Sequence, residues 1–410
     1  MNNENKKQIP EMRFPEFIDD GQWGMKKLKN ISEVIMGSSP SSLSYNENGI
    51  GLPLLQGNAD IKNRLSSPRI YTSEITKECK PEDILLSVRA PVGTVAKSLH
   101  KACIGRGISA LRTFKENSQE YLYQLLYSKE SSWKKVSQGG TFDAVNSDDI
   151  KNLLLPIPSP NEQQKIASCL SSLDELITAQ KEKLELLKNH KKGLMQNLFP
   201  QEGETVPKFR FPEFENDGDW DENNLGKMGK FLGGGTPSRL NDEHWVGNIP
   251  WISSSDISDN NIHKISTTQY INENAIRDSA TKIIPKGSIL FVSRVGVGKL
   301  AINNDRELCT SQDFTNFIPN KVFNYFIAYY FLANKNILQA LSQGTSIKGF
   351  SKSDLENLKI FHPRNIKEQE KIATCLSSLD NLISSQTAKI EKLQLHKKGL
   401  MQGLFPKMID

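Results

Sequence analysis

Two long stretches of the chain repeat apolar residues at alternating steps of four and three. The first stripe runs from Ile166 to Leu198 and the second from Ile372 to Leu404. This spacing is the heptad seam of a coiled coil, so each stretch is predicted to be one long helix. Each seam is broken by polar residues at the same two places: Gln180 and Lys191, then Gln386 and Lys397.

The two helical stretches are copies of each other. EQQKIASCLSSLDELITAQKEKLELLKNHKKGLMQNLFP (162–200) and EQEKIATCLSSLDNLISSQTAKIEKLQLHKKGLMQGLFP (368–406) are identical at 27 of 39 positions without a gap. A shorter marker opens each half, where PEMRFPEFIDDGQW (10–23) matches PKFRFPEFENDGDW (207–220). The chain is therefore a tandem duplication in which the helices changed little.

A narrow apolar seam on a single helix has to find a partner, and the other copy is the nearest one. We expect the two helices to pair as an antiparallel coiled coil. Gln180 and Gln386 lie near the middle of their helices. They are candidates for a buried polar pair that fixes the register, with partial exposure of each amide as the alternative.

Each half also contains short apolar runs that are rich in β-branched residues and bounded by turn formers. These runs predict strands, and they lie at 50–56, 83–88, 108–114, 248–253, 288–293 and 313–318. Helical patterns follow the strands at 119–128 and 321–341. We expect an α+β fold with two similar globular domains, 1–160 and 201–366, separated by spacer helices at 161–200 and 367–410.

Composition and charge exclude several classes of protein. At 410 residues, 37% hydrophobic and 24% charged, the chain is long enough for two packed domains. No apolar run is long enough to span a membrane and the polar start lacks the core of a signal peptide, so we expect a cytoplasmic protein. The net charge of +5 permits a polyanionic partner without requiring one. The five cysteines form no CxxC pair, which argues against a zinc site.

Motifs that resemble catalytic sites fail on inspection. SRVGVGKL (293–300) ends like a phosphate-binding loop, but Ser293 replaces the first glycine and Leu300 replaces the magnesium-binding hydroxyl. Gly296 and Gly298 are better explained by a turn. The six histidines contain no HExxH pattern, and no Gly-x-Ser-x-Gly segment is present. The sequence predicts no catalytic residue and no metal site.

Polar loops punctuated by glycine recur at matching positions of the two halves. Small hydroxyl groups suit phosphate oxygens, while Arg, Asn and Gln can read base edges with paired hydrogen bonds. The candidate DNA contacts are Ser38, Ser39, Ser41, Gln56, Asn58, Arg89, Gln138, Thr141, Thr236, Ser238, Arg239, Ser253, Ser255, Arg294, Lys299, Gln343 and Thr345. The alternative is that these are solvated loop residues, with Arg89 and Arg294 in surface ion pairs.

A variable domain, a helix that begins EQ(Q/E)KIA and closes in HKKGLMQ(N/G)LFP, and a second copy of this arrangement resemble the specificity (S) subunit of type I restriction-modification enzymes. The RFPEF marker at Phe14 and Phe211 is similar to the start of target-recognition domains in Gram-positive members. The resemblance covers essentially the whole chain.

The resemblance implies a noncatalytic protein. Each target-recognition domain would read one half of an asymmetric bipartite sequence in double-stranded DNA. The spacer helices would set the gap and dock two modification (methyltransferase) subunits, to which restriction (endonuclease/translocase) subunits add. S-adenosylmethionine, ATP and magnesium would serve those partners, and this chain would hold no cofactor.

The resemblance assigns docking to the apolar ends of the helices, whose residues are Leu194, Met195, Leu198, Phe199, Leu400, Met401, Leu404 and Phe405. Whether the assembly cleaves DNA or only methylates it stays open. The alternative from another class is a coiled-coil scaffold that joins proteins through two divergent domains.

Overall fold

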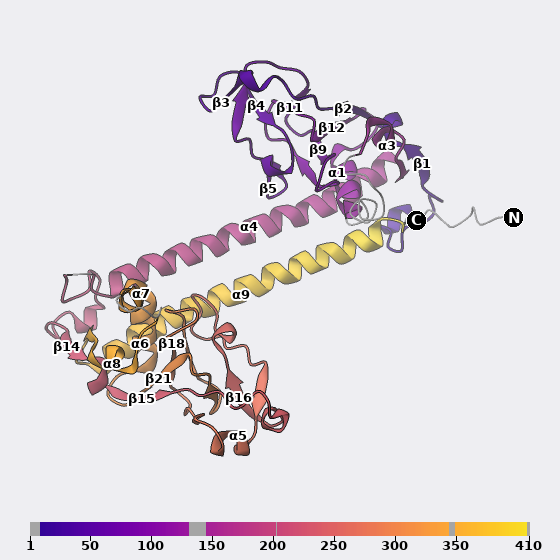
Figure 1. Ribbon diagram of the computed structural model, residues 1–410. Helices are drawn as coiled ribbons and strands as arrows, with labels where there is room; N and C mark the ends of the chain where they lie inside the picture. The colour runs from indigo at the N-terminus through magenta and orange to yellow at the C-terminus, as the bar shows by residue number, and fades with distance from the viewer. Residues whose placement is uncertain (1–8, 131–144, 202, 344–348, 408–410) are drawn as a thin grey trace. The chain divides into compact units, whose positions relative to one another are not determined.

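The computed structural model describes residues 9–130, 145–201, 203–343 and 349–407. The chain divides into two compact units (Figure 1). Unit 1 comprises residues 1–181 and 389–410, and unit 2 comprises residues 182–388. Each unit therefore contains one globular domain, the beginning of the helix that follows that domain and the end of the other long helix.

The described strands of unit 1 form three sheets. The order in the largest is β2-β12-β9-β10-β6-β5, with bounds Ser32–Met36, Ile108–Thr113, Ile84–Ser87, Val95–Lys97, Leu65–Ser66 and Ile61–Lys62. The second has the order β3-β7-β4-β11-β8, with bounds Tyr45–Asn46, Ile70–Thr72, Leu52–Leu55, Ala102–Ile104 and Glu78–Cys79. The third pairs β1 (Gly24–Lys27) with β13 (Leu154–Ile157) in antiparallel register.

Two shorter helices pack against the largest of these sheets. Helix α1 (Gln119–Ser128) is capped by the side chain of Ser118, and α3 (Ser147–Lys151) begins with a capping box at Asn146. The main core of the unit joins α1 and strands β9 and β12 to both long helices, through Ile166 and Leu170 of one and Met401 and Leu404 of the other. The long helices are thus part of the domain core.

Unit 2 repeats this plan with fewer strands. Its described sheets have the orders β15-β21-β18-β19, β17-β16-β20 and β14-β22. The bounds are Gly229–Gly233, Phe314–Pro319, Ile289–Val292 and Leu300–Ile302; Gln269–Ile271, Ile249–Ile252 and Cys309–Thr310; Asp221–Asn224 and Lys359–His362. Its shorter helices are α5 (Glu273–Arg277), α6 (Asn324–Ala333), α7 (Lys335–Gln343) and α8 (Lys352–Asn357).

The α+β class predicted from the sequence is confirmed, and all six predicted strands are present as β4, β9, β12, β16, β18 and β21. The helix predicted at 119–128 has those bounds as α1. The helical stretch predicted at 321–341 consists of two helices. The chain breaks at Asn334, whose φ of −113° and ψ of 52° are not helical, so that α6 and α7 are separate helices.

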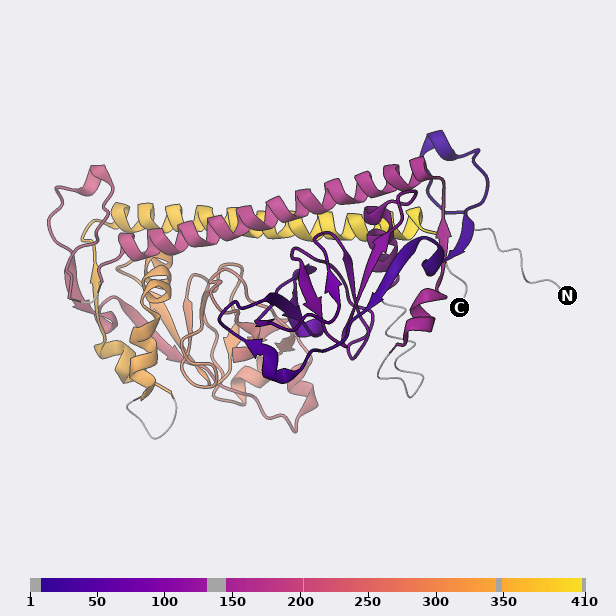
Figure 2. The ribbon, with the colours of Figure 1, turned by 90° about the horizontal axis from the view of Figure 1, so that it is seen from above.

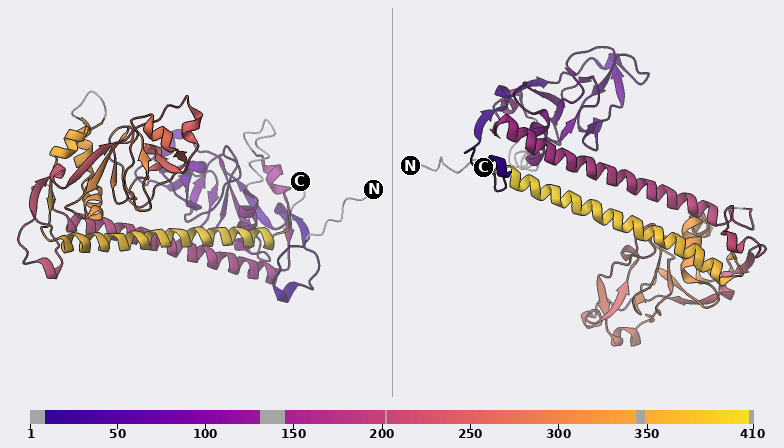
Figure 3. Two further views of the ribbon diagram at one scale, coloured as in Figure 1. Left: turned by 90° about the horizontal axis from the view of Figure 1, so that it is seen from below. Right: turned by 180° about the vertical axis from the view of Figure 1, so that it is seen from behind.

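The two spacer helices are α4 (Pro160–Leu198) and α9 (Ile366–Leu404), each of 39 residues. Within each unit their ends lie side by side and run in opposite directions, as Figures 2 and 3 show from other sides. In unit 2, Met195 and Leu198 of α4 pack with Ile372 and Leu376 of α9. The predicted antiparallel pairing is confirmed within each unit. The Gln180–Gln386 pair and the boundaries of the domains stay predictions.

Two expectations concern residues that could cross a membrane or hold a metal. No helix among the described residues is both long enough and apolar enough to cross a membrane. Cys79, Cys103 and Cys309 are buried thiols, whereas Cys169 and Cys375 are half-buried. The described residues contain no group of three His, Cys, Asp or Glu side chains placed to hold a metal ion.

Candidate nucleic-acid interface

In unit 1, the loops that carry the predicted contacts meet at one end of the sheets. The amide N of Gly105 donates to the carbonyl of Leu55 at 2.8 Å, which joins the β11–β12 turn to the loop after β4. The amide N of Val88 donates to the carbonyl of Gly107 at 3.0 Å, which brings the loop after β9 to the same turn. The sheet order therefore places three separate loops at one edge.

The predicted residues Gln56 and Asn58 lie on the loop after β4. Ser38 and Ser39 lie on the loop after β2, which joins the same edge because the amide N of Ser38 donates to Ile104 at 2.9 Å. The hydroxyl of Ser39 accepts from the backbone N of Arg106 at 3.2 Å. Arg106 is exposed and was not predicted, although its place between Gly105 and Gly107 marks a tight turn. Gln56 donates its side-chain Nε2 to the phenol of Tyr45 at 2.8 Å, so only part of its amide is available to a ligand.

Unit 2 brings the equivalent loops together with the same backbone bonds. The amide N of Ser311 donates to Ile252 at 2.8 Å and that of Ser293 donates to Asp313 at 2.8 Å. The amide N of Gly235 donates to Thr310 at 2.8 Å, which adds the loop that carries Thr236. The frame of the edge is thus common to both units.

The side chains on that frame differ. Arg239 stacks on Trp245 with its guanidinium carbon 3.7 Å from the ring centroid, and it lies 5.0 Å from the centroid of Trp251. Its Nη2 also donates to Gln269 at 3.0 Å. The guanidinium is therefore held in one orientation at an exposed edge. The equivalent residue in unit 1 is Ser42, which has no charge.

Ser253 and Ser255 are engaged in the fold of their own loop. The Oγ of Ser253 donates to the carboxylate of Asp256 at 2.7 Å and lies 2.8 Å from the Oγ of Ser255. The buried Asp256 also accepts from the backbone N of Ser253 at 2.8 Å. These hydroxyls build the capping box of a short 3-10 helix and have little capacity left for phosphate.

The predicted arginines occupy equivalent exposed positions. Arg89 follows β9 and Arg294 follows β18, and neither forms an ion pair with a residue that the structure describes. The nearby turn glycines Gly296 and Gly298 have φ of 91° and 94°, as expected for a turn. Lys299 lies 4.0 Å from the carboxylate of Asp259.

The last four predicted contacts lie on a further pair of equivalent segments, one in each half of the chain. Gln138, Thr141 and Thr345 lie outside the described residues. Gln343 is the last residue of α7. The flanking chain is tied to the arginine loops, because the amide N of Val145 donates to Val88 and that of Phe350 donates to Ser293, both at 3.0 Å.

The eight side chains predicted to dock partner subunits lie within or against the two cores. Met195, Leu198 and Phe199 are buried in unit 2, with Leu194 packed against them. Met401, Leu404 and Phe405 are buried in unit 1, with Leu400 packed against them. They attach the end of each long helix to a globular domain. Docking by these residues stays a prediction that their burial does not favour.

Two motifs found in the sequence turn out to be partners of each other. Arg13 of the first RFPEF marker forms a two-bond ion pair with Glu162, the first residue of the EQQKIA motif, at 2.7 Å for each bond. Arg210 forms the same pair with Glu368 at 2.8 Å. Both glutamates are buried. The markers therefore fasten the start of each domain to the start of its spacer helix.

The polar breaks in the seams are also explained by ion pairs. The Nζ of Lys397 lies 2.6 Å from both carboxylate oxygens of Asp174 in unit 1. In unit 2 the Nζ of Lys191 lies 2.6 Å from Asp380. The four residues are repeat equivalents, so one ion pair occurs twice. Because a shift of either helix would separate a buried lysine from its carboxylate, these pairs fix the antiparallel register.

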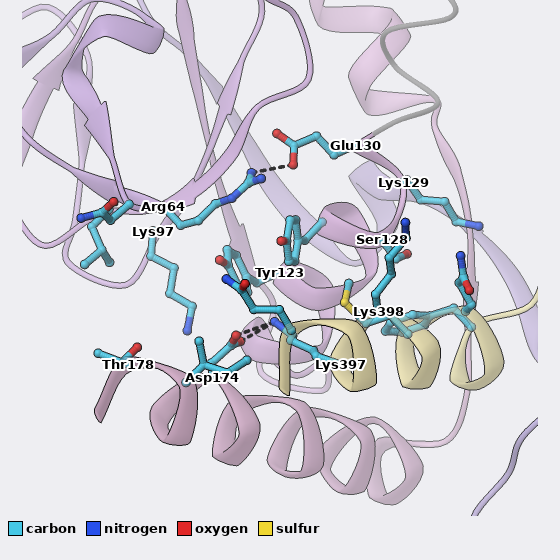
Figure 4. Close-up of a pocket in the computed structure, with 18 of the residues that line it drawn as sticks. Arg64, Lys97, Tyr123, Ser128, Lys129, Glu130, Asp174, Thr178, Lys397 and Lys398 are labelled. Atoms are coloured by element: carbon cyan, nitrogen blue, oxygen red, sulfur yellow. Dashed lines mark hydrogen bonds and ion pairs between the residues drawn. The ribbon is translucent and has the colours of Figure 1, made fainter. Parts of the chain in front are cut away.

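A hollow of about 1160 Å³ surrounds the first of these pairs, within unit 1. Figure 4 shows Lys97 of the domain extending toward Asp174 on α4 and Lys397 on α9, whereas Arg64 points to Glu130, with which it forms an ion pair. Seven cationic side chains and three carboxylates line it. Burial lowers the pKa of Lys397, although the hydrogen bond and the charge of Asp174 act in the opposite direction. The hollow is a basic surface next to the helix pair.

Comparison with known proteins identifies relatives. The family model described as type I restriction modification DNA specificity domain matches residues 21–189 and 217–395. The chain is 27% identical over 413 residues to the type I restriction enzyme MjaIX specificity subunit of Methanocaldococcus jannaschii, covering 94% of this chain and 92% of the relative.

Other relatives match about half of the chain. The putative type I restriction enzyme MjaX specificity subunit of the same organism is 37% identical over 180 residues, which cover 43% of this chain and only 42% of the relative. The EcoR124I/EcoR124II specificity subunit of Escherichia coli is 32% identical over 182 residues, or 42% of this chain and 44% of the relative.

Solved structures share the fold. The S subunit of a type I restriction-modification system from M. genitalium superimposes with a TM-score of 0.65 at 16% identity, covering 98% of this chain and 100% of that chain. A chain from a structural study of complex assembly and conformational transition of the type I R-M system gives a TM-score of 0.57 at 17% identity, with 94% and 98% covered.

Proposed function

The chain belongs to the type I restriction-modification DNA specificity family, and we propose that it is the noncatalytic subunit that selects an asymmetric, bipartite DNA site. Each globular domain reads one half-site, and the helix pair sets the unread gap between the halves. We place this activity in the cytoplasm, where the cell's DNA lies.

One observation supports this proposal above the others. Both units hold the same set of loops with the same backbone hydrogen bonds, yet the exposed side chains on the loops differ. Arg239, which is stacked and oriented, suits a paired hydrogen bond to a guanine edge, whereas its counterpart Ser42 offers a single hydroxyl. A shared frame with different side chains is what two unlike half-sites require.

The charge of the edges supports DNA as the partner. Arg89, Arg106 and Arg294 are exposed on the loops. The basic hollow of unit 1 adds lysines from both helices, which suit phosphate groups. This electrostatic attraction to the phosphates does not depend on sequence. It would bind the duplex while the loop side chains contact the base edges.

We propose that the exposed sides of α4 and α9 dock two methyltransferase subunits, to which restriction subunits are added. The buried helix ends are occupied by the chain's own cores. The exposed apolar residues of these helices are better suited to a protein partner, and they include Leu176, Leu186, Leu382 and Leu395. S-adenosylmethionine, ATP and magnesium are bound and used by the partner subunits, and this chain binds none of them.

Exchange of one domain tests the proposal. The chain is expressed with its methyltransferase partner, residues 24–155 are replaced by the corresponding part of another family member, and adenine methylation is mapped across the genome. We expect one half-site to change while the other half-site is retained, because each domain would read its own half.

An exchange of residues 221–361 in unit 2 is the matched control, and it should change the other half-site. If either exchange alters both half-sites, or if neither exchange alters any, the assignment of one half-site to each domain is wrong. Absence of methylation with the unaltered chain and its partner would contradict the proposed function itself.

A further inference from the structure

Two strongly exposed leucines lie at equivalent positions of the two edges. Leu43 closes the segment PSSL (40–43) and Leu240 closes PSRL (237–240). Their exposed fractions are 95% and 99%, which are the highest of any large hydrophobic side chain in the described part of the chain. The surrounding domains have diverged widely, so this shared feature of two variable loops calls for a reason.

The same local bond holds each leucine in place. The backbone N of Leu43 donates to the Oγ of Ser41 at 3.4 Å, and that of Leu240 donates to the Oγ of Ser238 at 3.3 Å. These serines were predicted to contact DNA directly, and that contact stays a prediction. Their hydroxyls also shape the turn that presents the leucine.

Further bonds fix both turns to the sheets. In unit 1 the backbone N of Ser41 donates to Glu74 at 3.0 Å, and the Oγ of Ser44 lies 2.8 Å from that of Thr72. In unit 2 the indole of Trp245 donates to the carbonyl of Ser238 at 3.1 Å. Each leucine is therefore carried on an anchored turn, so little order has to be gained on binding.

The neighbours of the leucines indicate what covers them. Ser42 and Ser44 flank Leu43, while Arg239 and Asn241 flank Leu240. A protein partner usually covers a continuous apolar patch of several hundred Å², and neither leucine is followed or preceded in the sequence by an apolar residue that would extend one. A stack of bases is different, because a single apolar side chain can contact a thymine methyl group or enter between two base pairs.

We propose that Leu43 and Leu240 are apolar base-contact residues, each inserted into the DNA of the half-site that its own domain reads. The inference rests on the proposed function. The proposal adds an apolar contact to the polar ones in each half-site. Because each leucine is almost fully exposed in the free protein, its burial against DNA would remove nearly all of its apolar surface from water, which favours binding.

Binding by the chain together with its methyltransferase partner tests this proposal. The probe is a duplex that carries the site found by methylation mapping, and the variants are Leu43→Ser and Leu240→Ser. Leu99→Ser, at a half-exposed leucine beyond β10, is the control. We expect each of the first two to weaken binding roughly 5- to 50-fold and the control to leave it unchanged.

Altered duplexes separate the two half-sites and the two kinds of contact. Scrambling one half-site should abolish the effect of one leucine variant and leave the effect of the other. Replacement of thymine by uracil detects a methyl contact as weaker binding to the wild-type complex only. Increased fluorescence of 2-aminopurine on binding, reduced in the serine variant, detects a wedge between bases. Either signal supports the proposal.

Three results would overturn it. Unchanged binding by both variants would remove the leucines from the interface. Loss of assembly with the methyltransferase would identify them as protein contacts. Weaker binding with neither the uracil nor the 2-aminopurine signal would place the contact away from the bases. In each case, site-specific methylation by the wild-type complex would leave the proposed function intact.

Discussion

The ion pair between the long helices occurs twice, but its surroundings in unit 1 and unit 2 differ. The side chain of Asp174 is 40% exposed, whereas that of its repeat equivalent Asp380 is only 13% exposed. The lysines, Lys397 and Lys191, are buried in both units. The same helix residues therefore pair a buried lysine with an exposed carboxylate in unit 1 and with a largely buried carboxylate in unit 2.

The difference comes from the domain helix that packs on each junction. The sixth residue of α1 is Gln124, whose Nε2 donates to Asp174 at 2.8 Å. The sixth residue of α6 is Tyr329, whose phenol donates to Asp380 at 2.6 Å. In unit 2, His263 adds a ring nitrogen 3.3 Å from Asp380. Thus the diverged domains set the strength of a junction whose helix residues stayed the same.

The largest predicted effect on stability comes from removing Asp380, the less exposed of the two carboxylates. Asp380→Ala leaves Lys191 charged, buried and without its carboxylate, so we expect the free energy of unfolding to fall by about 3–5 kcal/mol. Asp174→Ala should lower it by only about 1 kcal/mol, since water reaches that site and replaces the partner. Urea denaturation followed by circular dichroism measures both.

Glu175→Ala, at an exposed position next to Asp174 on the same helix, is the control for loss of a surface carboxylate. Equal losses for Asp380→Ala and Asp174→Ala would contradict the comparison, because they would mean that the neighbouring domain does not modulate the junction.

The second prediction uses pH. Burial raises the pKa of Asp380, but hydrogen bonds from His263, Lys191 and Tyr329 outweigh it, and the net pKa is below the ordinary 3.8. A lowered carboxylate pKa stabilises the fold above the unfolded pKa, and this stabilisation is lost as pH falls through the folded value. The difference in unfolding free energy between wild type and Asp380→Ala should therefore be smaller at pH 2.5 than at pH 6. A difference that stays constant would exclude an ionised Asp380.

Much of this architecture could be predicted from the sequence. Leucine spacing predicted both long helices, because periodicity reflects which face is buried. Short apolar runs bounded by turn residues predicted strands such as β9 and β18, which are buried along their whole length. The helix break at Asn334 was missed, since apolar residues continue on both sides of it and only the backbone shows the change of direction.

Pairings between distant residues were not predictable in the same way. Lys191 and Lys397 stood out as breaks in the seams, but their carboxylates lie outside the seams. The one available signal was that Asp174 and Asp380 are retained in both copies. The apolar helix ends were assigned to partner docking by the family resemblance, although an apolar Leu or Phe in a sequence fits a partner surface and the chain's own core equally well. Only the packing of Phe199 and Phe405 distinguishes the two.

The smallest predicted effect concerns Tyr329 and Gln124, the side chains of the globular domains that donate to Asp380 and Asp174. Tyr329→Phe removes the hydroxyl that donates to Asp380 and keeps the ring, so we expect the free energy of unfolding to fall by about 1–2 kcal/mol. Gln124→Met should change it by less than about 0.5 kcal/mol. The Oε1 of Gln124 is buried without a described partner, so losing it offsets the loss of the Nε2 bonds to Asp174 and Glu120. A double-mutant cycle of Tyr329→Phe with Asp380→Ala should give a coupling of about 1 kcal/mol, whereas Gln124→Met with Asp174→Ala should give a smaller one, because Asp174 is more exposed to water. Equal couplings in the two cycles would show that tyrosine and glutamine serve these junctions alike, and the difference between the junctions would then rest on exposure to water alone.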